Sequence, residues 1–384
     1  MHSTTALPKI VLFLGAGASA VAGYHTFAGF PDLIFSDEIR NQERLGQLHS
    51  TTQTLLKDIE QSLHIVNKAT THDNFLWALN DYTRLWHVLR VDDVLRSRFL
   101  KSTVQWSEFA YFAQTVEDAI HDLTVTTVRH YSANKVKASR QPSDPNYGPM
   151  CELFEFYRLL AVRNNSQAPY LPIFTTNYDL LLEDLTAEFG NRSKPALKLV
   201  NGFAGCTQEE AIWNEREYEA QPEGIHLYRL HGCVSWYWDS SEQAMLQYCR
   251  NDIPEHSLAN LCAIYPGCEG SLGSNPHAYG FRKLNEMLLN CTVALFIGFS
   301  FRDNDVMHIL LSANAQRKQP LQLIVVDPAL TSKTVIERLR NSGLKTQHPV
   351  RRPHADNVHC INIQYGIDNF SEVISNVIDQ TLKG

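Results

Sequence analysis

A run of apolar residues that ends in Gly-x-Gly constrains the fold of this chain more than any other feature. It spans residues 10–19, with the sequence IVLFLGAGAS. Consecutive apolar residues are typical of a parallel strand that is covered on both faces. Gly15 and Gly17 lack a Cβ, so the backbone can turn tightly and approach a pyrophosphate, whose charge the first amides of a following helix can hold. The run predicts a dinucleotide site, although the same pattern also occurs where a strand merely turns into a helix.

A dehydrogenase-type unit is the first alternative for this region. It would place a second strand at residues 33–37, ending in an acid that holds a ribose. The segment before that strand contains Gly23, Gly29 and Pro31, which leave too few unbroken residues for the crossover helix of a parallel βαβ unit. We therefore expect residues 18–31 to form a short helix followed by a loop over the nucleotide.

Length and charge exclude several classes of protein. The chain has 384 residues, enough for one large domain or two ordinary ones. Its net charge is -7 and no block of Lys and Arg stands out, so no direct nucleic-acid partner is expected. The first residues do not resemble an export signal and no apolar run has the length of a membrane span, so we expect a cytoplasmic protein that does not bind a membrane.

The eight cysteines are expected to be reduced thiols, because no export signal accompanies them. Cys233, Cys249, Cys262 and Cys268 lie close enough in the sequence to raise the question of a zinc site. None of these four has the Cys-x-x-Cys spacing with which one turn presents two thiolates to a metal. We therefore expect no metal.

Apolar runs typical of buried strands recur along the chain. They lie at residues 9–14, 170–174, 225–230, 292–297 and 321–326, with a weaker run at 358–363. Several of them are apolar at consecutive positions, which favours parallel strands covered on both faces. The sequence thus predicts an α/β fold with a Rossmann-like parallel sheet.

A long stretch with helical periodicity separates the first and second of these runs. Apolar side chains recur at helical spacing in residues 76–94 and again in residues 109–120. This pattern predicts a large helical insertion after the first strand. We expect residues 1–36 and 165–384 to form the Rossmann-like domain that binds the dinucleotide and residues 37–164 to form the helical insertion subdomain.

Four later segments place polar residues or glycines at the ends of apolar runs. They are FTTNYD at 174–179, LHG at 230–232, GFS at 298–300 and VVDP at 325–328. Open α/β sheets bind ligands at the carboxyl ends of their strands, so the joint occurrence favours one common site. Each segment alone also has a structural explanation. Asn177 or Asp179 can cap a helix, while His231 can be a satisfied core histidine and Gly298 can merely permit a turn.

The order of these segments resembles that of the motifs of the sirtuin superfamily. The matching motifs are GAGAS at 15–19, GYHTF at 23–27, TTNYD at 175–179, LHG at 230–232 and GFS at 298–300. The Asn-Tyr-Asp version of the third motif, together with IGFSFRD at 297–303, resembles the sirtuin-like domains of prokaryotic antiphage defence rather than the protein deacetylases. The resemblance covers residues 11 to about 330 and implies NAD as the substrate.

The chain departs from the deacetylases where those enzymes bind their protein substrate. Their Gly-Ile-Pro-Asp-Phe-Arg loop corresponds to GYHTFA at 23–28, and a near-copy at 29–33 leaves open which loop lines the nicotinamide site. The sequence has no paired Cys-x-x-Cys after His231 and no Phe-Gly-Glu segment for an acetyl-lysine peptide. The motifs for the cofactor are therefore present, whereas those for a protein substrate are missing.

The resemblance implies a role for each matched residue. Asn177 would hold the ribose and position a water, and His231 would act as a general base. Asp179 would hold the carboxamide, and Asp327 would reach the adenosine ribose, where it would select NAD over NADP. The other cofactor-binding residues that the resemblance implies are Gly15, Ala16, Gly17, Ser19, Thr26, Phe27, Gly298 and Ser300.

The resemblance, together with the missing motifs for a protein substrate, implies an NAD+ hydrolase that acts in antiphage defence by depleting NAD. A sirtuin-type protein deacylase or ADP-ribosyltransferase is one alternative, and a nucleotide-binding regulatory subunit without catalysis is another. A hydrolase that is always active would kill its host, so we expect regulation through a homo-oligomer. The resemblance also suggests a partner protein such as a HerA-type ATPase.

Overall fold

The computed structural model describes residues 10–20, 156–158, 160, 170–189, 197–204, 210–239, 241–248, 261–263, 275–319, 321–342 and 358–361. The loop expected after residue 20 and nearly all of the insertion expected at 37–164 lie outside these residues. The division of the chain into a Rossmann-like domain and a helical insertion therefore remains a prediction.

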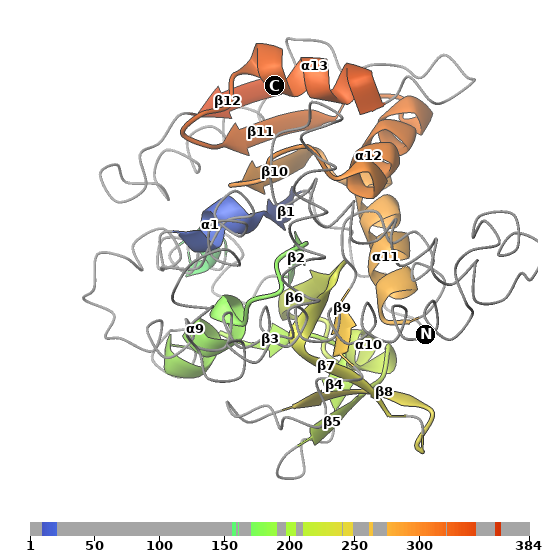
Figure 1. Ribbon diagram of the computed structural model, residues 1–384. Coiled ribbons are helices and arrows are strands. Elements are labelled where there is room, and N and C mark those ends of the chain that lie inside the picture. Colours follow the sequence, from blue (N-terminus) through green and yellow to red (C-terminus); the bar gives the residue numbers. More distant parts are fainter. Residues whose placement is uncertain are drawn as a thin grey trace, which may run out of the picture.

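Within the described residues, seven parallel strands form one sheet (Figure 1). They are β1 (Ile10–Leu14), β2 (Tyr170–Thr175), β3 (Leu199–Val200), β6 (Gly224–Arg229), β10 (Val293–Ile297), β11 (Gln322–Val326) and β12 (Val358–Ile361). Their order in the sheet is β12-β11-β10-β1-β2-β6-β3, and each neighbouring pair is parallel. The strands predicted from the apolar runs are confirmed, and the short β3 is an addition at the edge.

The strand order has the reversal of direction that is typical of a Rossmann fold. The chain runs outward from β1 through β2 to β6, then returns to β10 on the other side of β1 and continues to β11 and β12. The order therefore reverses between β1 and β10, and open α/β sheets bind their ligands at such a point. The predicted Rossmann-like α/β fold is confirmed.

Helices cover both faces of this sheet (Figure 1). On one face lie α11 (His277–Asn290), α12 (Asn304–Gln316) and α13 (Ser332–Ser342), whose apolar side chains share a buried cluster with Val11 and Phe13 of β1. The alternate residues Ile10, Leu12 and Leu14 of β1 are also buried. Near them, on the opposite face, are α1 (Ala16–Ala20) and α9 (Leu181–Phe189). The consecutive apolar residues of β1 are thus explained by burial on both sides.

A second, antiparallel sheet was not predicted from the sequence. It consists, among the described residues, of β4 (Phe203–Ala204), β5 (Glu210–Trp213), β7 (Gly232–Asp239), β8 (Ala244–Tyr248) and β9 (Leu261–Ala263), in the order β4-β5-β8-β7-β9. The short helix α10 (Arg216–Ala220) follows β5. In Figure 1 this sheet lies beyond the β6 end of the parallel sheet.

The two sheets are joined by the direct passage from β6 into β7. Leu230 and His231 alone separate these two strands. Gly232, the first residue of β7, has φ +83°, and a Cβ there would collide with the carbonyl of Cys262. The tight junction therefore requires glycine at this position, and it places His231 between the sheets. In the part of the chain that the structure describes, no helix is both long and apolar enough to cross a membrane.

Candidate active site

The carboxyl ends of five parallel strands form one row at the edge of the sheet. Leu14 of β1 lies beside Thr175 of β2 and Ile297 of β10. Arg229 of β6 and Val326 of β11 extend the row on either side. The segments that follow these strands are the ones that the sequence singled out, so the structure brings them to the same edge.

Three predicted site glycines meet where the strand order reverses. The amide of Gly15 donates to the carbonyl of Ile297 at 2.9 Å, and the amide of Gly17 donates to the carbonyl of Gly298 at 3.0 Å. A Cβ on Gly15 or Gly17 would fall against the backbone of Gly298, and a Cβ on Gly298 would fall on the backbone nitrogen of Ala18. The glycines therefore let two turns pack against each other. Their contact with a pyrophosphate remains a prediction.

Asn177 is tied to the turn between β1 and α1. Its Nδ2 donates to the carbonyl of Gly15 and to Oγ of Ser19, both at 3.0 Å. Its backbone amide donates to Oγ1 of Thr175, which itself donates to the carbonyl of Leu14. The remaining polar atom of the side chain, Oδ1, is buried and has no hydrogen-bond partner among the described residues. Asn177 thus holds an acceptor in a fixed position at the strand edge.

Asp179 has a structural role that the sequence left open. Its Oδ1 accepts a hydrogen bond from the amide of Leu181, the first residue of α9, at 3.1 Å. Burial raises the pKa of Asp179 above its ordinary value, and this effect outweighs the lowering by Arg229 and by the hydrogen bonds from Leu181 and Ser19. The carboxyl of Asp179 therefore supports the helix start, and its surroundings favour the protonated form.

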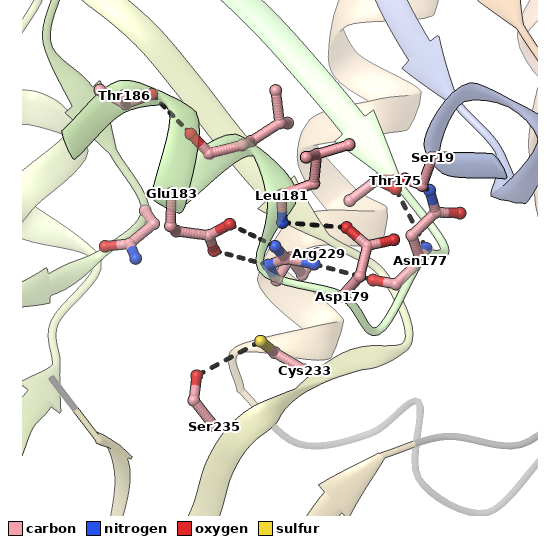
Figure 2. A network of polar contacts seen from close by, with 12 residues as sticks. Ser19, Thr175, Asn177, Asp179, Leu181, Glu183, Thr186, Arg229, Cys233 and Ser235 are labelled. Atoms are coloured by element: carbon pink, nitrogen blue, oxygen red, sulfur yellow. Dashed lines mark hydrogen bonds and ion pairs between the residues drawn. The ribbon is translucent and has the colours of Figure 1, made fainter. Parts of the chain in front are cut away.

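A buried ion pair, missed by the sequence analysis, holds the loop that carries Asn177 (Figure 2). Nε and Nη2 of Arg229 donate to the two carboxylate oxygens of Glu183 at 2.9 and 2.6 Å. Nη1 of the same guanidinium donates to the backbone carbonyl of Asn177 at 2.8 Å. The side chain of Arg229 is 2% exposed. An arginine inside a buried strand requires such a partner. The position of Arg229 within an apolar run was therefore the sequence signal that could have indicated a buried ion pair.

His231 is paired with a carboxylate that the sequence analysis did not assign. Its Nε2 lies 2.9 Å from Oδ2 of Asp303. The other oxygen of Asp303 accepts the amides of Asp305 and Val306, so Asp303 is the N-cap of α12. The second ring nitrogen of His231, Nδ1, is buried and has no hydrogen-bond partner in the described part of the chain. Only one of the two ring nitrogens of His231 therefore has a partner among the described residues. A histidine with a purely structural role in the core would have partners for both.

Ser300 and Asp327 lie at the same edge, after β10 and β11. Ser300 is exposed, and its backbone carbonyl accepts a hydrogen bond from Nη1 of Arg338. Oδ1 of Asp327 accepts the amides of Ala329 and Leu330 at 2.8 and 3.1 Å, which closes a turn after the strand. The contacts expected of these two residues with a pyrophosphate and with the adenosine ribose remain predictions.

Some of the predicted site falls outside the described residues. Thr26 and Phe27 lie there, as do both loops that were candidates for the nicotinamide site. Ala16 is described and begins α1. Cys249 and Cys268 also fall outside, while within the described ranges no group of three or more His, Cys, Asp and Glu residues could hold a metal ion. The expectation of no metal is therefore still a prediction.

A comparison with protein families finds a match. A family model described as a SIR2-like domain matches residues 172–346. The matched region begins in β2 and extends beyond α13, so it contains Asn177, His231 and Asp303. This part of the chain is therefore similar to a SIR2-like domain. A comparison with curated proteins finds no match.

Similar solved structures include two mutants of a Sir2 homologue, each in a complex with ADP-ribose. Their sequence identities to this chain are 12% and 11%, with TM-scores of 0.39 and 0.38, and each alignment covers 97% of this chain and 92% of the other. A third structure, described by the words "Structural Basis for the Mechanism and Regulation of Sir2 Enzymes", is 11% identical with a TM-score of 0.35. Its alignment covers 97% of this chain and 93% of the other.

Proposed function

We propose that this protein is an NAD+ glycohydrolase, which cleaves NAD to nicotinamide and ADP-ribose and needs no acyl-lysine substrate. One observation carries the proposal. Oδ1 of Asn177 and Nδ1 of His231 are both buried beside the carboxyl edge of the sheet, and neither has a hydrogen-bond partner among the described residues. Buried polar atoms are paired in the great majority of cases. Two unpaired polar atoms at one strand edge therefore favour a ligand that supplies the hydrogen bonds.

The chemistry of the bond suits these two groups. The pyridinium nitrogen of NAD carries a positive charge, so nicotinamide leaves as a neutral molecule with the electron pair of the broken bond. A water oxygen forms the new bond to the ribose C1′, and one proton is released. Oδ1 of Asn177 accepts a hydrogen bond from the ribose or from this water, and His231 accepts the proton as a general base.

The proposal extends to a role as an effector of antiphage defence that depletes NAD. Its support is the resemblance of the motifs at 177–179 and 297–303 to the sirtuin-like domains of such systems. A homo-oligomer and a partner such as a HerA-type ATPase belong to the same proposal, because hydrolysis of NAD has to be restrained until infection.

Release of nicotinamide from NAD by the purified full chain, without any peptide, tests the activity. We expect release by the wild type, and a loss of about a hundredfold to ten-thousandfold in Asn177→Ala and in His231→Ala, the usual range for a general base. Asn290→Ala on α11 and His308→Ala on α12 are matched controls, because both side chains are exposed. Both controls should retain the wild-type rate.

Two results would contradict the proposal. Wild-type rates in both site variants would remove Asn177 and His231 from the mechanism. Turnover that appears only after an acyl-lysine peptide is added would instead identify a protein deacylase. Circular dichroism of each variant shows whether a lost activity reflects the site or a lost fold.

A further inference from the structure

Asp303 joins two functions in one carboxylate. Oδ1 accepts the amides of Asp305 and Val306 at 3.1 and 3.0 Å and so caps α12. Oδ2 lies 2.9 Å from Nε2 of His231, and the side chains of Asp303 and His231 are 14% and 5% exposed. The helix start therefore holds the carboxylate rigidly, and the carboxylate in turn restricts the imidazole ring.

The charge state of Asp303 follows from its contacts. Burial by itself raises the pKa of Asp303, but His231 and the amides of Val306 and Asp305 together lower it below the ordinary carboxyl value. An ionised carboxylate only accepts hydrogen bonds. The hydrogen of a neutral His231 ring therefore belongs on Nε2, and Nδ1 retains a lone pair.

Among the described residues, two further titratable side chains lie near His231, one from α11 and one from the loop after β2. His277 of α11 places Nδ1 3.2 Å from the carbonyl of Leu230, and because a carbonyl only accepts, this nitrogen carries a hydrogen. Burial, with a smaller contribution from the neighbouring His231, lowers the pKa of His277 to about 4, although the hydrogen bond to Leu230 acts in the opposite direction. His277 is therefore uncharged near neutral pH. The ring of Tyr178, from the loop after β2, lies 6.4 Å from the ring of His231.

We propose that Asp303 is a positioning residue that fixes His231 in the Nε2–H tautomer and leaves Nδ1 as the proton acceptor of the site. The identity of the proton donor rests on the proposed function: it is the water or ribose hydroxyl of the NAD reaction. When Nδ1 takes that proton, the resulting imidazolium lies beside the Asp303 carboxylate, which stabilises its charge. Asp303 itself does not touch the substrate.

Imidazole nitrogen NMR of the full chain labelled with 15N-histidine reads the tautomer directly, without any substrate. Spectra at about pH 8, where an ordinary histidine is neutral, should show a proton on Nε2 of His231, with the signal assigned by its loss in His231→Gln. Asp303→Asn keeps an N-cap side chain, since Asn and Asp are equally good caps. We expect this variant to lose the uniform Nε2–H tautomer.

Kinetics provide the second readout. In Asp303→Asn, kcat for nicotinamide release should fall by about a hundredfold to ten-thousandfold while KM changes little, as expected when the orientation of a general base is lost. Asp239→Asn is the matched control and should leave both the tautomer and kcat unchanged. Asp239 is the last residue of β7, and its carboxylate accepts the amides of Ser241 and Glu242. A His231 ring protonated on Nδ1 in the wild type, or an unchanged tautomer and kcat in Asp303→Asn, would overturn the inference.

The two readouts separate this inference from the proposed function. An Nε2–H tautomer that depends on Asp303, in a protein that releases no nicotinamide from NAD, would support the positioning role and reject the hydrolase. The reverse result, an active hydrolase whose His231 tautomer does not depend on Asp303, would reject the positioning role alone.

Discussion

Position 298 requires glycine because of the backbone around it, not because of a side-chain contact. Its φ is +60°, a region that residues with a side chain rarely adopt, and a Cβ there would fall on the backbone of Gly17 and Ala18. The motif pattern indicated a glycine with a role at this position. It did not indicate this reason, because the contact depends on β1 and β10, far apart in the sequence, being neighbours in the sheet.

We expect Gly298→Ala to destabilise the protein by more than about 1–2 kcal/mol, which is the cost of the left-handed backbone alone, because the turn after β1 must also move. Gly280→Ala on α11 is the matched control. Its Cβ would meet Cδ2 of Leu230 at 3.2 Å and the carbonyl of Arg229 at 3.8 Å, and alanine gains about 1 kcal/mol of helix propensity over glycine. Urea unfolding of both variants measures the difference. Equal midpoints would show that the backbone contact at Gly298 is unimportant for stability.

The candidate catalytic residues differ in how far the sequence could predict them. His231 directly follows an apolar run and Asn177 comes three residues after one, so their position at the carboxyl edge could be inferred from the order of strands and polar residues. Asp303 looks like an ordinary N-cap in the sequence. Its contact with His231 depends on how the start of α12 lies against the end of β6, which no local pattern encodes.

The loop between β2 and α9 is held by contacts from three elements. Arg229 of β6 binds Glu183 of α9 and the carbonyl of Asn177, and the amide of Val234 in β7 donates to the carbonyl of Tyr178 at 3.1 Å. The loop is therefore anchored on both sides of its functional residues. A rigid loop of this kind keeps the acceptor of Asn177 in place.

Breaking the pair of Arg229 and Glu183 should be costly. Glu183→Gln leaves the charge of Arg229 buried and unpaired, which typically costs about 3–5 kcal/mol, and we expect a loss of NAD hydrolysis along with it. Glu215→Gln, which breaks an exposed pair with Arg282 at 3.5 Å, is the matched control and should cost at most about 1 kcal/mol. Thermal and denaturant unfolding provide the comparison. A similar small cost for both substitutions would mean that the buried pair does not hold the loop.

Among the elements, the longer parallel strands were predictable, whereas the antiparallel strands and the short parallel strand β3 were not. Strands such as β10 are buried at every position, so their composition alone distinguishes them. By contrast β5 alternates between buried and exposed residues over a very short length, and β3 has only two residues. Short strands of this kind depend on their partners in the sheet, which a local pattern does not reveal.

At the scale of the molecule, the site is built where three arrangements coincide. The reversal of strand order between β1 and β10 brings Gly15 and Gly298 together, and the passage from β6 into β7 places His231 beside the second sheet. The capped start of α12 then supplies Asp303. The stretch expected to form a helical insertion, residues 37–164, lies in the chain between β1 and β2.

We predict that this insertion makes contacts between copies of the chain, because its sequence contains more apolar helical surface than one sheet edge needs. The protein should therefore be a homo-oligomer, and a neighbouring copy that completes or orders the site would explain how assembly switches hydrolysis on. Light scattering should give a mass that is a multiple of the 43.6 kDa of one chain. The specific activity should fall as the protein is diluted and the oligomer dissociates.

The variant Asn177→Ala is the control for this experiment. It should have the same mass as the wild type but no activity at any concentration, because the residue lies in the site and outside the predicted interface. A mass of 43.6 kDa at micromolar protein, together with an undiminished specific activity on dilution, would reject both the oligomer and its role as a switch. An oligomer whose specific activity does not change on dissociation would retain the assembly and reject the switch, since each copy would then complete its site alone.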